Sequence, residues 1–127
     1  MIKAYALASL ISEKELNWLY SAPKEMGKFI ALIFSIDGVP VGLSLSRLYK
    51  LKHGYEATIL QLQSSGVSVE MYQWMISETA ALLAKGKSCN IRCNTSCLKV
   101  AEALTQTGFK QRSTSQTVWW SRDQEPP

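Results

Sequence analysis

The fold is decided by residues 55–93, which read YEATILQLQSSGVSVEMYQWMISETAALLAKGKSCNIRC. An apolar run over residues 55–62 predicts a strand, and Gln63–Ser68 is a polar loop. Apolar residues then recur at helical spacing over residues 69–83, and a second strand is predicted over residues 87–93. A strand, a helix and a strand in this order form parallel neighbours through a right-handed crossover. This stretch therefore predicts a pair of parallel strands covered by a helix.

The residues before this stretch predict an antiparallel meander. Phe29–Phe34 is an apolar run, and Asp37-Gly38 is a strong signal for a two-residue hairpin turn. Apolar and polar residues alternate over 39–46, which predicts a strand with one apolar face. A turn over residues 50–54 then leads into the next strand. Residues 28–62 are therefore expected to form three antiparallel strands.

Further elements are predicted toward both ends of the chain. Residues 2–7 have the pattern of a strand, and Ser12-Glu-Lys-Glu15 is a capping box that opens a short helix. Asn94-Thr-Ser96 offers N-caps for a later helix that ends at Gly108, and residues 109–120 are extended. The sequence thus predicts an α/β (α+β) fold with a mixed sheet of about six to seven strands. An antiparallel meander precedes a parallel strand pair in this sheet, and about three helices flank it.

Composition indicates one globular domain. The chain has 127 residues, of which 46% are hydrophobic and 19% charged, and its mean hydropathy is −0.04. We expect a single domain over residues 1–121 and a frayed tail over residues 122–127. No apolar run approaches the roughly 18 residues of a membrane span. Residues 1–15 lack the pattern of a signal peptide, so a cytoplasmic protein without a membrane partner is expected.

The net charge of +4 comes from 14 Lys and Arg against 10 Asp and Glu. The basic residues are scattered singly along the chain, so the pattern does not favour nucleic-acid binding. Nor does the sequence show basic and aromatic residues interleaved on one strand face, as an RNA platform requires. This small positive net charge either serves only to keep the protein soluble or provides a positive field that suits a phosphorylated cofactor or an acidic partner.

The three cysteines, Cys89, Cys93 and Cys97, are spaced four residues apart. An odd number of cysteines argues against a disulfide framework. A zinc site needs a fourth ligand, whereas the one histidine, His53, is distant in sequence. The sequence therefore predicts buried thiols and no metal site.

Gln63–Ser68 is the segment with the most potential for chemistry. A loop that leaves a strand and opens a helix directs unpaired amide N–H groups at one point, where the helix dipole adds positive potential. Gly66 allows close approach to the backbone, and the neighbouring serines are small and carry hydroxyl donors. These residues indicate either a phosphate site or an ordinary helix start with small polar residues.

Gln63-x-x-Gly66-x-Ser68 resembles the pyrophosphate-binding motif of the GNAT acyltransferases, which has Gln or Arg, two residues, Gly, one residue, and then Gly or Ala. The segment stands in the matching place, after the fourth predicted strand and at the start of the long helix. Asn94 through Gly108-Phe109 is similar to a late block of the family, which has a strand, Asn, a helix and Gly-Phe. The order of elements agrees from residue 1 to about 120. The resemblance implies a GNAT-like fold.

The resemblance also implies an activity, the transfer of an acyl group from acetyl-CoA or another acyl-CoA to an amine. The cofactor would lie where the fourth and fifth strands diverge. The main chain of Gln61–Gln63 would pair with the pantetheine arm, and the amides of Ser64–Ser68 would hold the pyrophosphate. The amine would attack the thioester directly. The residues that the resemblance assigns to the cofactor are Gln61, Leu62, Gln63, Ser64, Ser65, Gly66, Val67, Ser68 and Asn94.

The chain departs from the family pattern in several places. Ser68 stands where the family has Gly or Ala, and Cys97, rather than Asn94, stands at the position of the family's asparagine. Leu104 stands where the family often has a tyrosine that protonates the leaving thiolate. Glu56, on the fourth predicted strand, is the candidate general base, and the alternative for it is a surface carboxylate.

Three functions are compatible with the sequence. The first is an acetyl-CoA-dependent N-acetyltransferase that acts on a primary amine, such as a protein lysine, without a metal. The second is a catalytically degenerate protein of the same fold, of the kind that phages encode, which binds CoA or a protein partner without acyl transfer. The third is an unrelated α/β binding domain. Only residues 9–27 separate the first two predicted strands, so the acceptor side is expected to be open to a peptide or to a second copy of the chain.

Overall fold

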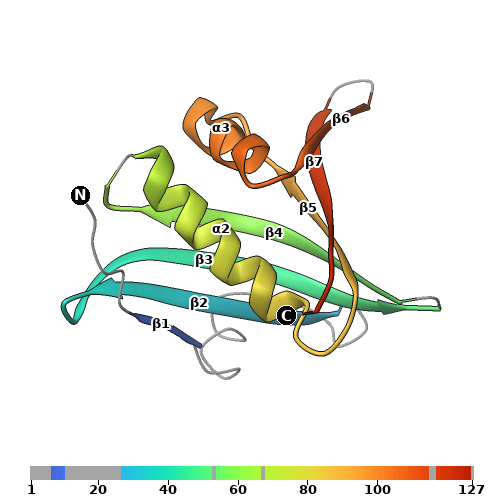
Figure 1. The fold of residues 1–127 in the computed structure, drawn as a ribbon, viewed down its shortest axis with the longest axis horizontal. Coiled ribbons are helices and arrows are strands. Elements are labelled where there is room, and N and C mark those ends of the chain that lie inside the picture. Colours follow the sequence, from blue (N-terminus) through green and yellow to red (C-terminus); the bar gives the residue numbers. More distant parts are fainter. Residues whose placement is uncertain (1–6, 11–26, 53, 67, 115–116, 127) are drawn as a thin grey trace.

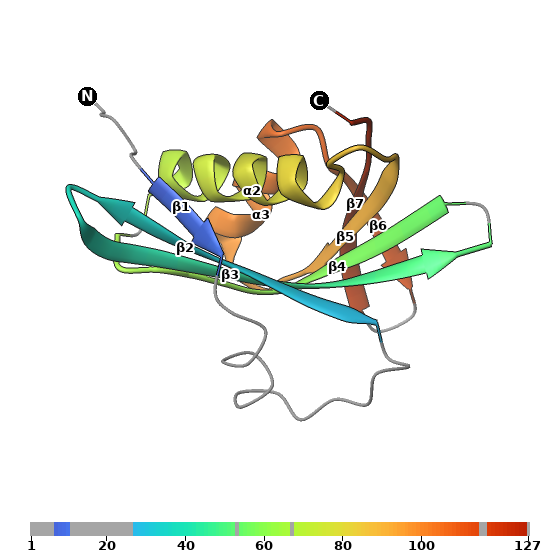
Figure 2. The same cartoon turned by 90° about the horizontal axis from the view of Figure 1, so that it is seen from below.

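The computed structural model describes residues 7–10, 27–52, 54–66, 68–114 and 117–126. Over these residues the chain forms a seven-stranded sheet in the order β1-β2-β3-β4-β5-β7-β6, with both described helices on one face (Figures 1 and 2). The elements are β1 (Leu7–Leu10), β2 (Lys28–Ile36), β3 (Val39–Leu51), β4 (Gly54–Ser64), α2 (Val69–Leu83), β5 (Cys89–Asn94), α3 (Leu98–Gln106), β6 (Lys110–Thr114) and β7 (Thr117–Gln124).

The mixed sheet predicted from the sequence is confirmed. The four strands from β1 to β4 are antiparallel, β4 and β5 are parallel, and β5, β7 and β6 are again antiparallel. Of the roughly three helices expected, α2 and α3 fall within the described residues. The helix predicted from Ser12 lies outside them. No helix in the described part of the chain is long and apolar enough to cross a membrane.

The predicted hairpin turn at Asp37-Gly38 is confirmed and joins β2 to β3. Asp37 has a φ of 52° and Gly38 a φ of 80°. Positive φ at both central residues defines the turn type whose twist matches that of the flanking strands. The turn pairs Ile36 with Val39 and so fixes the register of the whole ribbon.

The parallel pair of β4 and β5 is short. Its register runs from Tyr55 opposite Cys89 to Ile59 opposite Cys93, and β4 then continues to Ser64 beside β3 alone. The pairing of β4 with β3 shifts at this point, which leaves Leu60 as an extra, half-exposed residue. Such a bulge bends the strand locally. The divergence of β4 from β5 is therefore built into the backbone.

The core lies between the sheet and the helices. Met75, Ile76 and Leu83 of α2 are fully buried against the strands. Full burial of side chains of this size contributes about 1.5–3 kcal/mol each. Gly42 of β3 permits the close approach, because a Cβ there would lie 2.9 Å from Sδ of Met75. The ring of Phe34 meets that of Trp74 edge-on, with centroids 4.9 Å apart. α2 therefore holds the meander in place.

β3 is buried on both faces in its middle. Leu43 and Leu45 share the face away from α2, where Leu45 packs with Ala31, as the alternation predicts. The opposite face carries small polar residues, and α2 lies directly over them. The hydroxyl groups of Ser44 and Thr79 are hydrogen-bonded at 2.7 Å, and both residues are at most 2% exposed. A polar strand face can thus be part of the core when a helix supplies the hydrogen-bond partner.

The Ser44–Thr79 pair yields a stability prediction. Thr79→Val leaves the Ser44 hydroxyl buried without its partner, which is expected to lower the free energy of unfolding by about 1–3 kcal/mol. The double variant Ser44→Ala/Thr79→Val removes both hydroxyls and should therefore be more stable than Thr79→Val alone. Urea unfolding of the four proteins of this cycle measures the coupling. Simple additivity of the two single effects would contradict a direct bond between these hydroxyls.

The ends of the sheet differ from the prediction. Residues 2–6 of the predicted first strand lie outside the described residues, and the described strand β1 runs from Leu7 to Leu10. The extended segment predicted after Gly108 is two strands, β6 and β7, which pair with each other. β7 also continues into the predicted tail as far as Gln124, which lies opposite Cys89 of β5. The reason is local pairing, since Asp123 accepts a hydrogen bond from the Asn90 side chain at 2.7 Å.

Candidate functional site

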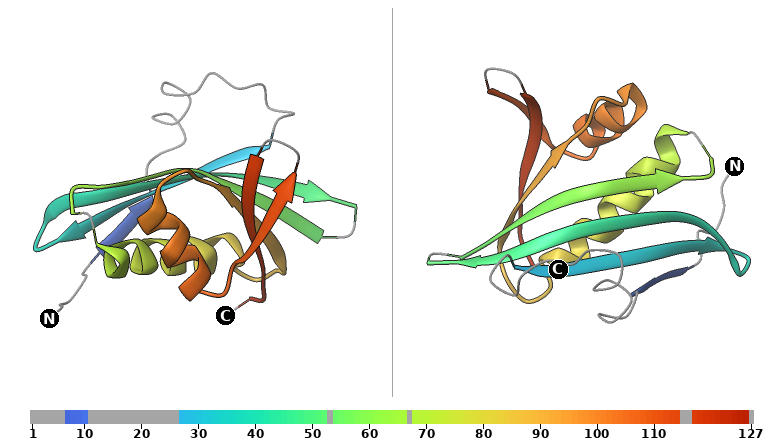
Figure 3. Two further views of the ribbon diagram at one scale, coloured as in Figure 1. Left: turned by 90° about the horizontal axis from the view of Figure 1, so that it is seen from above. Right: turned by 180° about the vertical axis from the view of Figure 1, so that it is seen from behind.

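β4 and β5 diverge beyond Ile59 and Cys93 (Figures 1 and 3). A cleft lies at this point. Its volume is about 340 Å³. One wall is the free side of β4 beyond its last pair with β5, and the other is the end of β5 with the segment that leads into α3. The lining residues are Ile59, Leu60, Gln61, Leu62, Gln63, Tyr72, Cys93, Asn94, Thr95, Ser96, Cys97 and Val100.

The β4 wall offers main-chain hydrogen-bonding groups. Beyond Ile59, β4 pairs only with β3, so the peptide groups that point away from β3 have no strand neighbour. Such groups at a strand edge readily bind an extended chain or ligand. Gln61, Leu62 and Gln63 all line the cleft along this edge. Of the predicted cofactor residues, these three and Asn94 are brought together here.

The loop after β4 is closed by its own hydrogen bonds. The amide of Ser65 donates to the carbonyl of Val41 at 2.8 Å, and the amide of Gly66 donates to Oγ of Ser64 at 3.2 Å. Oγ of Ser64 in turn donates to the carbonyl of Gly66. Ser64 and Ser65 also line a second hollow with Pro40 and Val41, rather than the cleft itself. Val67 lies outside the described residues.

Ser68 is the N-cap of α2. Its backbone is extended, with φ −119° and ψ 149°, and its Oγ accepts a hydrogen bond from the amide of Met71 at 3.1 Å. The first intrahelical bond joins the amide of Tyr72 to the carbonyl of Ser68. The amides of Val69 and Glu70 therefore precede the helical ladder and point out of the helix end. Within the described residues, neither of these two amides donates a hydrogen bond to the loop.

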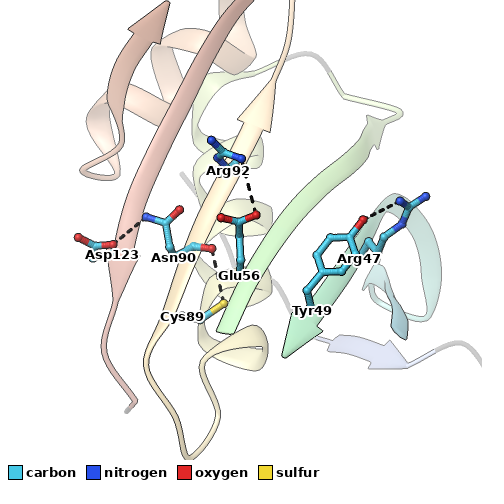
Figure 4. A network of polar contacts seen from close by, with 7 residues as sticks. All are labelled: Arg47, Tyr49, Glu56, Cys89, Asn90, Arg92 and Asp123. Atoms are coloured by element: carbon cyan, nitrogen blue, oxygen red, sulfur yellow. Dashed lines mark hydrogen bonds and ion pairs between the residues drawn. The ribbon is translucent and has the colours of Figure 1, made fainter. Parts of the chain in front are cut away.

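Glu56 lies outside the cleft, on the face of the sheet opposite α2 (Figure 4). Its Oε1 is 3.6 Å from Nη1 of Arg92, and its side chain is 30% exposed. On β3, the neighbouring Tyr49 hydroxyl accepts a hydrogen bond from Arg47 at 2.7 Å. Within the described part of β4, Glu56 is the one carboxylate. It stands three residues before the point where the strands diverge.

Only part of the cysteine prediction is confirmed. Cys89 and Cys93 are buried, and burial raises the pKa of the Cys89 thiol to about 11 and that of Cys93 to about 12. Both thiols are therefore neutral and unreactive at neutral pH. Cys97, by contrast, is exposed and lines the cleft, where it is the N-cap residue of α3. Among the described residues, no group of three or more His, Cys, Asp or Glu side chains is placed to hold a metal ion.

Tyr72 is the main cleft residue that the sequence pattern concealed. It was one of the apolar positions of α2, and it is indeed only 7% exposed. Tyr72 nevertheless lines the cleft, beside the diverging ends of β4 and β5. Burial, and to a smaller degree the thiol of Cys97, raises the pKa of Tyr72 above its ordinary value of 10.0. Tyr72 is therefore a protonated hydroxyl at neutral pH. Leu104, which stands where the GNAT family often has a tyrosine, is fully buried in the core.

No known family model matches the sequence, and no curated protein is similar to it at a significant level. Solved structures do match the fold. NAA60 of Arabidopsis thaliana, solved in complex with a bisubstrate analogue, is 11% identical, with a TM-score of 0.53 and 76% of each chain covered. A protein described as a GnaT-family acetyltransferase, from Bordetella pertussis, is 12% identical, with a TM-score of 0.39, and the match covers 88% of this chain and 71% of that one. The order and direction of the strands and the match to NAA60 together show that the chain has a GNAT-like fold.

Proposed function

We propose that the protein is an N-acetyltransferase that transfers an acetyl group from acetyl-CoA to a primary amine. The observation that carries this proposal is the cleft between β4 and β5, which runs along an unpaired strand edge toward the capped start of α2. The match in fold to NAA60, whose structure holds a bisubstrate analogue, supports it. A narrow cleft beside a strand edge suits an extended, amide-containing chain such as pantetheine.

The donor is expected to bind through the backbone. None of the described residues that line the cleft carries a charged side chain, so the phosphates would be held mainly by amide groups and by the dipole of α2. Pantetheine would pair with the main chain of Gln61–Gln63, with Asn94 on the opposite wall. The pyrophosphate would lie at the loop of Ser64, Ser65, Gly66, Val67 and Ser68 and at the amides of Val69 and Glu70. Binding at Gly66 would compete with the bond between its amide and Ser64.

The chemistry requires one bond to form and one to break. The amine nitrogen attacks the thioester carbon, the carbon–sulfur bond breaks, and the thiolate of CoA takes a proton. Tyr72 is the proposed proton donor, because it lines the cleft and its raised pKa keeps it protonated at neutral pH. Glu56 is the proposed base that accepts the proton of the amine, through water, from the opposite face of the sheet. The remaining contribution of the protein is positioning.

Substitution of Ser68 separates its two proposed roles. Ser68→Ala removes the side-chain cap of α2 and is expected to lower the free energy of unfolding by about 1 kcal/mol. Ser68→Asp keeps a capping oxygen, so its stability should match that of the wild type within about 0.5 kcal/mol. Its carboxylate would repel the pyrophosphate, however, and should weaken CoA binding by roughly tenfold or more. Urea unfolding and calorimetric titration measure the two effects. Unchanged CoA affinity in Ser68→Asp would contradict a pyrophosphate at this helix end.

The transfer reaction itself is tested by turnover. Purified protein is mixed with acetyl-CoA and a panel of lysine peptides, peptides with free N-termini and polyamines, and release of the CoA thiol is followed with a thiol reagent. Acceptor-dependent release is the expected result. Binding of acetyl-CoA without release for any acceptor would favour the alternative, a degenerate protein of this fold that binds CoA without transfer.

A further inference from the structure

The face of the sheet opposite the helices carries a row of cations at the end where β4 and β5 diverge. The register places Arg92 of β5 between Thr58 of β4 and Ser121 of β7, and Ser121 lies opposite Lys110 of β6. On the other side, Thr58 lies opposite Arg47 of β3. Residues directly opposite one another project from the same face of a sheet. The cations of this row therefore share one face, although they come from three distant parts of the sequence.

A second row on the same face lies directly beside the cleft. Asn94 pairs with Trp119, and Trp119 pairs with Arg112 of β6. The guanidinium carbon of Arg92 is 5.8 Å from the centre of the Trp119 ring, so the two rows are in contact. Arg92, Lys110 and Arg112 are exposed. These three cations and Trp119 are called the cationic face below.

Two nearby carboxylates neutralise this face only in part. Glu56 is paired with Arg92, and Asp123 accepts a hydrogen bond from Asn90 (Figure 4). Within the described residues, Lys110 and Arg112 have no acidic partner in an ion pair. Two of the three cations are thus available to an incoming anion, and Arg92 adds a positive charge held in place by Trp119 and Glu56.

The cationic face adjoins the open side of the cleft. Asn94 lines the cleft and also neighbours Trp119, so a molecule that enters from this face passes over both residues. The cleft itself has no charged lining. The positive charge of this region therefore lies where an acceptor would approach rather than where the donor would lie. Positive charge at this approach would also favour the neutral form of an amine, which is the form that attacks.

We propose that the cationic face binds an acidic peptide segment that presents a primary amine to the cleft, so that the acceptor is a peptide with carboxylates flanking its amine. This inference rests on the proposed function for the role of the amine. Guanidinium groups bind carboxylates in bidentate pairs, which suits Arg112, while Arg92, already paired with Glu56, adds positive charge beside it. β6 is also an edge strand, which gives an extended peptide main-chain partners next to Lys110 and Arg112.

A single-stranded nucleic acid fits this surface less well. Its recognition depends on exposed aromatic rings on which successive bases stack. The cationic face has one aromatic residue, Trp119, whose ring is already covered by Arg92. A phosphate backbone is also usually followed by a longer series of cations than the three of this face.

The test compares three probes by fluorescence anisotropy at low ionic strength. They are a short labelled peptide with one lysine flanked by glutamates, the same peptide with glutamines in place of the glutamates, and a short oligothymidylate. The wild-type protein is expected to bind the glutamate peptide at least tenfold more tightly than either of the others. Lys110→Gln/Arg112→Gln should weaken that binding by roughly tenfold. Lys85→Gln is the control, since Lys85 is exposed at the end of α2, away from this face, and its loss should change affinity by less than about twofold.

Equal binding of the glutamate and glutamine peptides would overturn the proposal, and so would an unchanged affinity in Lys110→Gln/Arg112→Gln. Tighter binding of oligothymidylate would overturn it in favour of a nucleic-acid surface. With acetyl-CoA present, the lysine of the glutamate peptide should be acetylated with a lower KM than that of the glutamine peptide. Peptide binding in a protein that does not bind acetyl-CoA would contradict the proposed transferase function while leaving the docking surface in place.

Discussion

Tyr72→Phe is expected to lower kcat for acetyl transfer by about 100-fold and to leave the KM for acetyl-CoA within about twofold. The substitution removes a single oxygen atom from a side chain that is 7% exposed and keeps the ring that packs in the core. The departing thiolate then has to take its proton from water or from a weaker donor. The effect therefore falls on the chemical step rather than on binding. Steady-state kinetics with thiol detection measures both constants.

Tyr55→Phe is the matched control for this prediction. Tyr55 lies on β4 at the far end of its pairing with β5, opposite Cys89, and does not line the cleft. The kcat of Tyr55→Phe should equal that of the wild type within about twofold. The raised pKa of Tyr72 also predicts that any fall of kcat from loss of its proton begins at a higher pH than for an ordinary tyrosine. An unchanged kcat in Tyr72→Phe would show that Tyr72 is not the proton donor.

Leu104→Ala is expected to lower the free energy of unfolding by about 2–5 kcal/mol. Leu104 is fully buried in the core, and its helix joins the late strands to α2. Deleting three carbon atoms leaves a cavity that a short helix packed on two sides can only partly fill. The magnitude is a large fraction of the stability of a domain of this size. Urea unfolding followed by tryptophan fluorescence measures it.

Leu98→Ala is the control for that measurement, because Leu98 lies on the same helix and is 86% exposed. The same chemical change should there cost less than about 0.5 kcal/mol. Similar effects of the two substitutions would contradict the placement of Leu104 in the core. The burial of Leu104 also fits the absence of the family's tyrosine at residue 104. A tyrosine there would have to fit a fully packed site.

Local signals in the sequence were sufficient for most of the fold. Asp37-Gly38 determines the β2–β3 hairpin because two adjacent residues with positive φ suit very few other sequences. The strand–helix–strand unit of residues 55–93 determines the parallel pair because such crossovers have one hand. The split of the last extended segment into β6 and β7 was missed, because Lys110–Thr114 is polar and becomes a strand only by pairing with β7.

The site was predicted less completely, for reasons of tertiary packing. Gln61–Gln63 and Asn94 meet at the cleft because element order alone places the ends of β4 and β5 together. Tyr72 was not predicted as a cleft residue, because its helical spacing indicates a core position. The spacing does not show where β4 and β5 diverge beneath the helix. Cys97 differs from the buried Cys89 and Cys93 because β5 ends between them, which breaks the alternation.

The cationic face shows the same limit. Lys110 and Arg112 are two residues apart, whereas Arg92 lies on another strand well before them in the sequence. Arg92 becomes their neighbour only because the last two strands enter the sheet in the order β5-β7-β6. The sequence therefore gives the small positive net charge of the chain, whereas the strand register shows on which part of the sheet the basic residues gather.

Binding of CoA in the cleft between β4 and β5 tests the account most directly. Thermal unfolding is measured with CoA and with acetyl-CoA for the wild type, for Ser96→Trp, which fills the cleft, and for Ser77→Trp, which adds the same ring on an exposed turn of α2. Ligand at about 100 times its dissociation constant should stabilise the wild type and Ser77→Trp by about 2.7 kcal/mol and should not stabilise Ser96→Trp. No stabilisation of the wild type at millimolar ligand, or equal stabilisation of Ser96→Trp, would contradict an acyl-CoA site in this cleft.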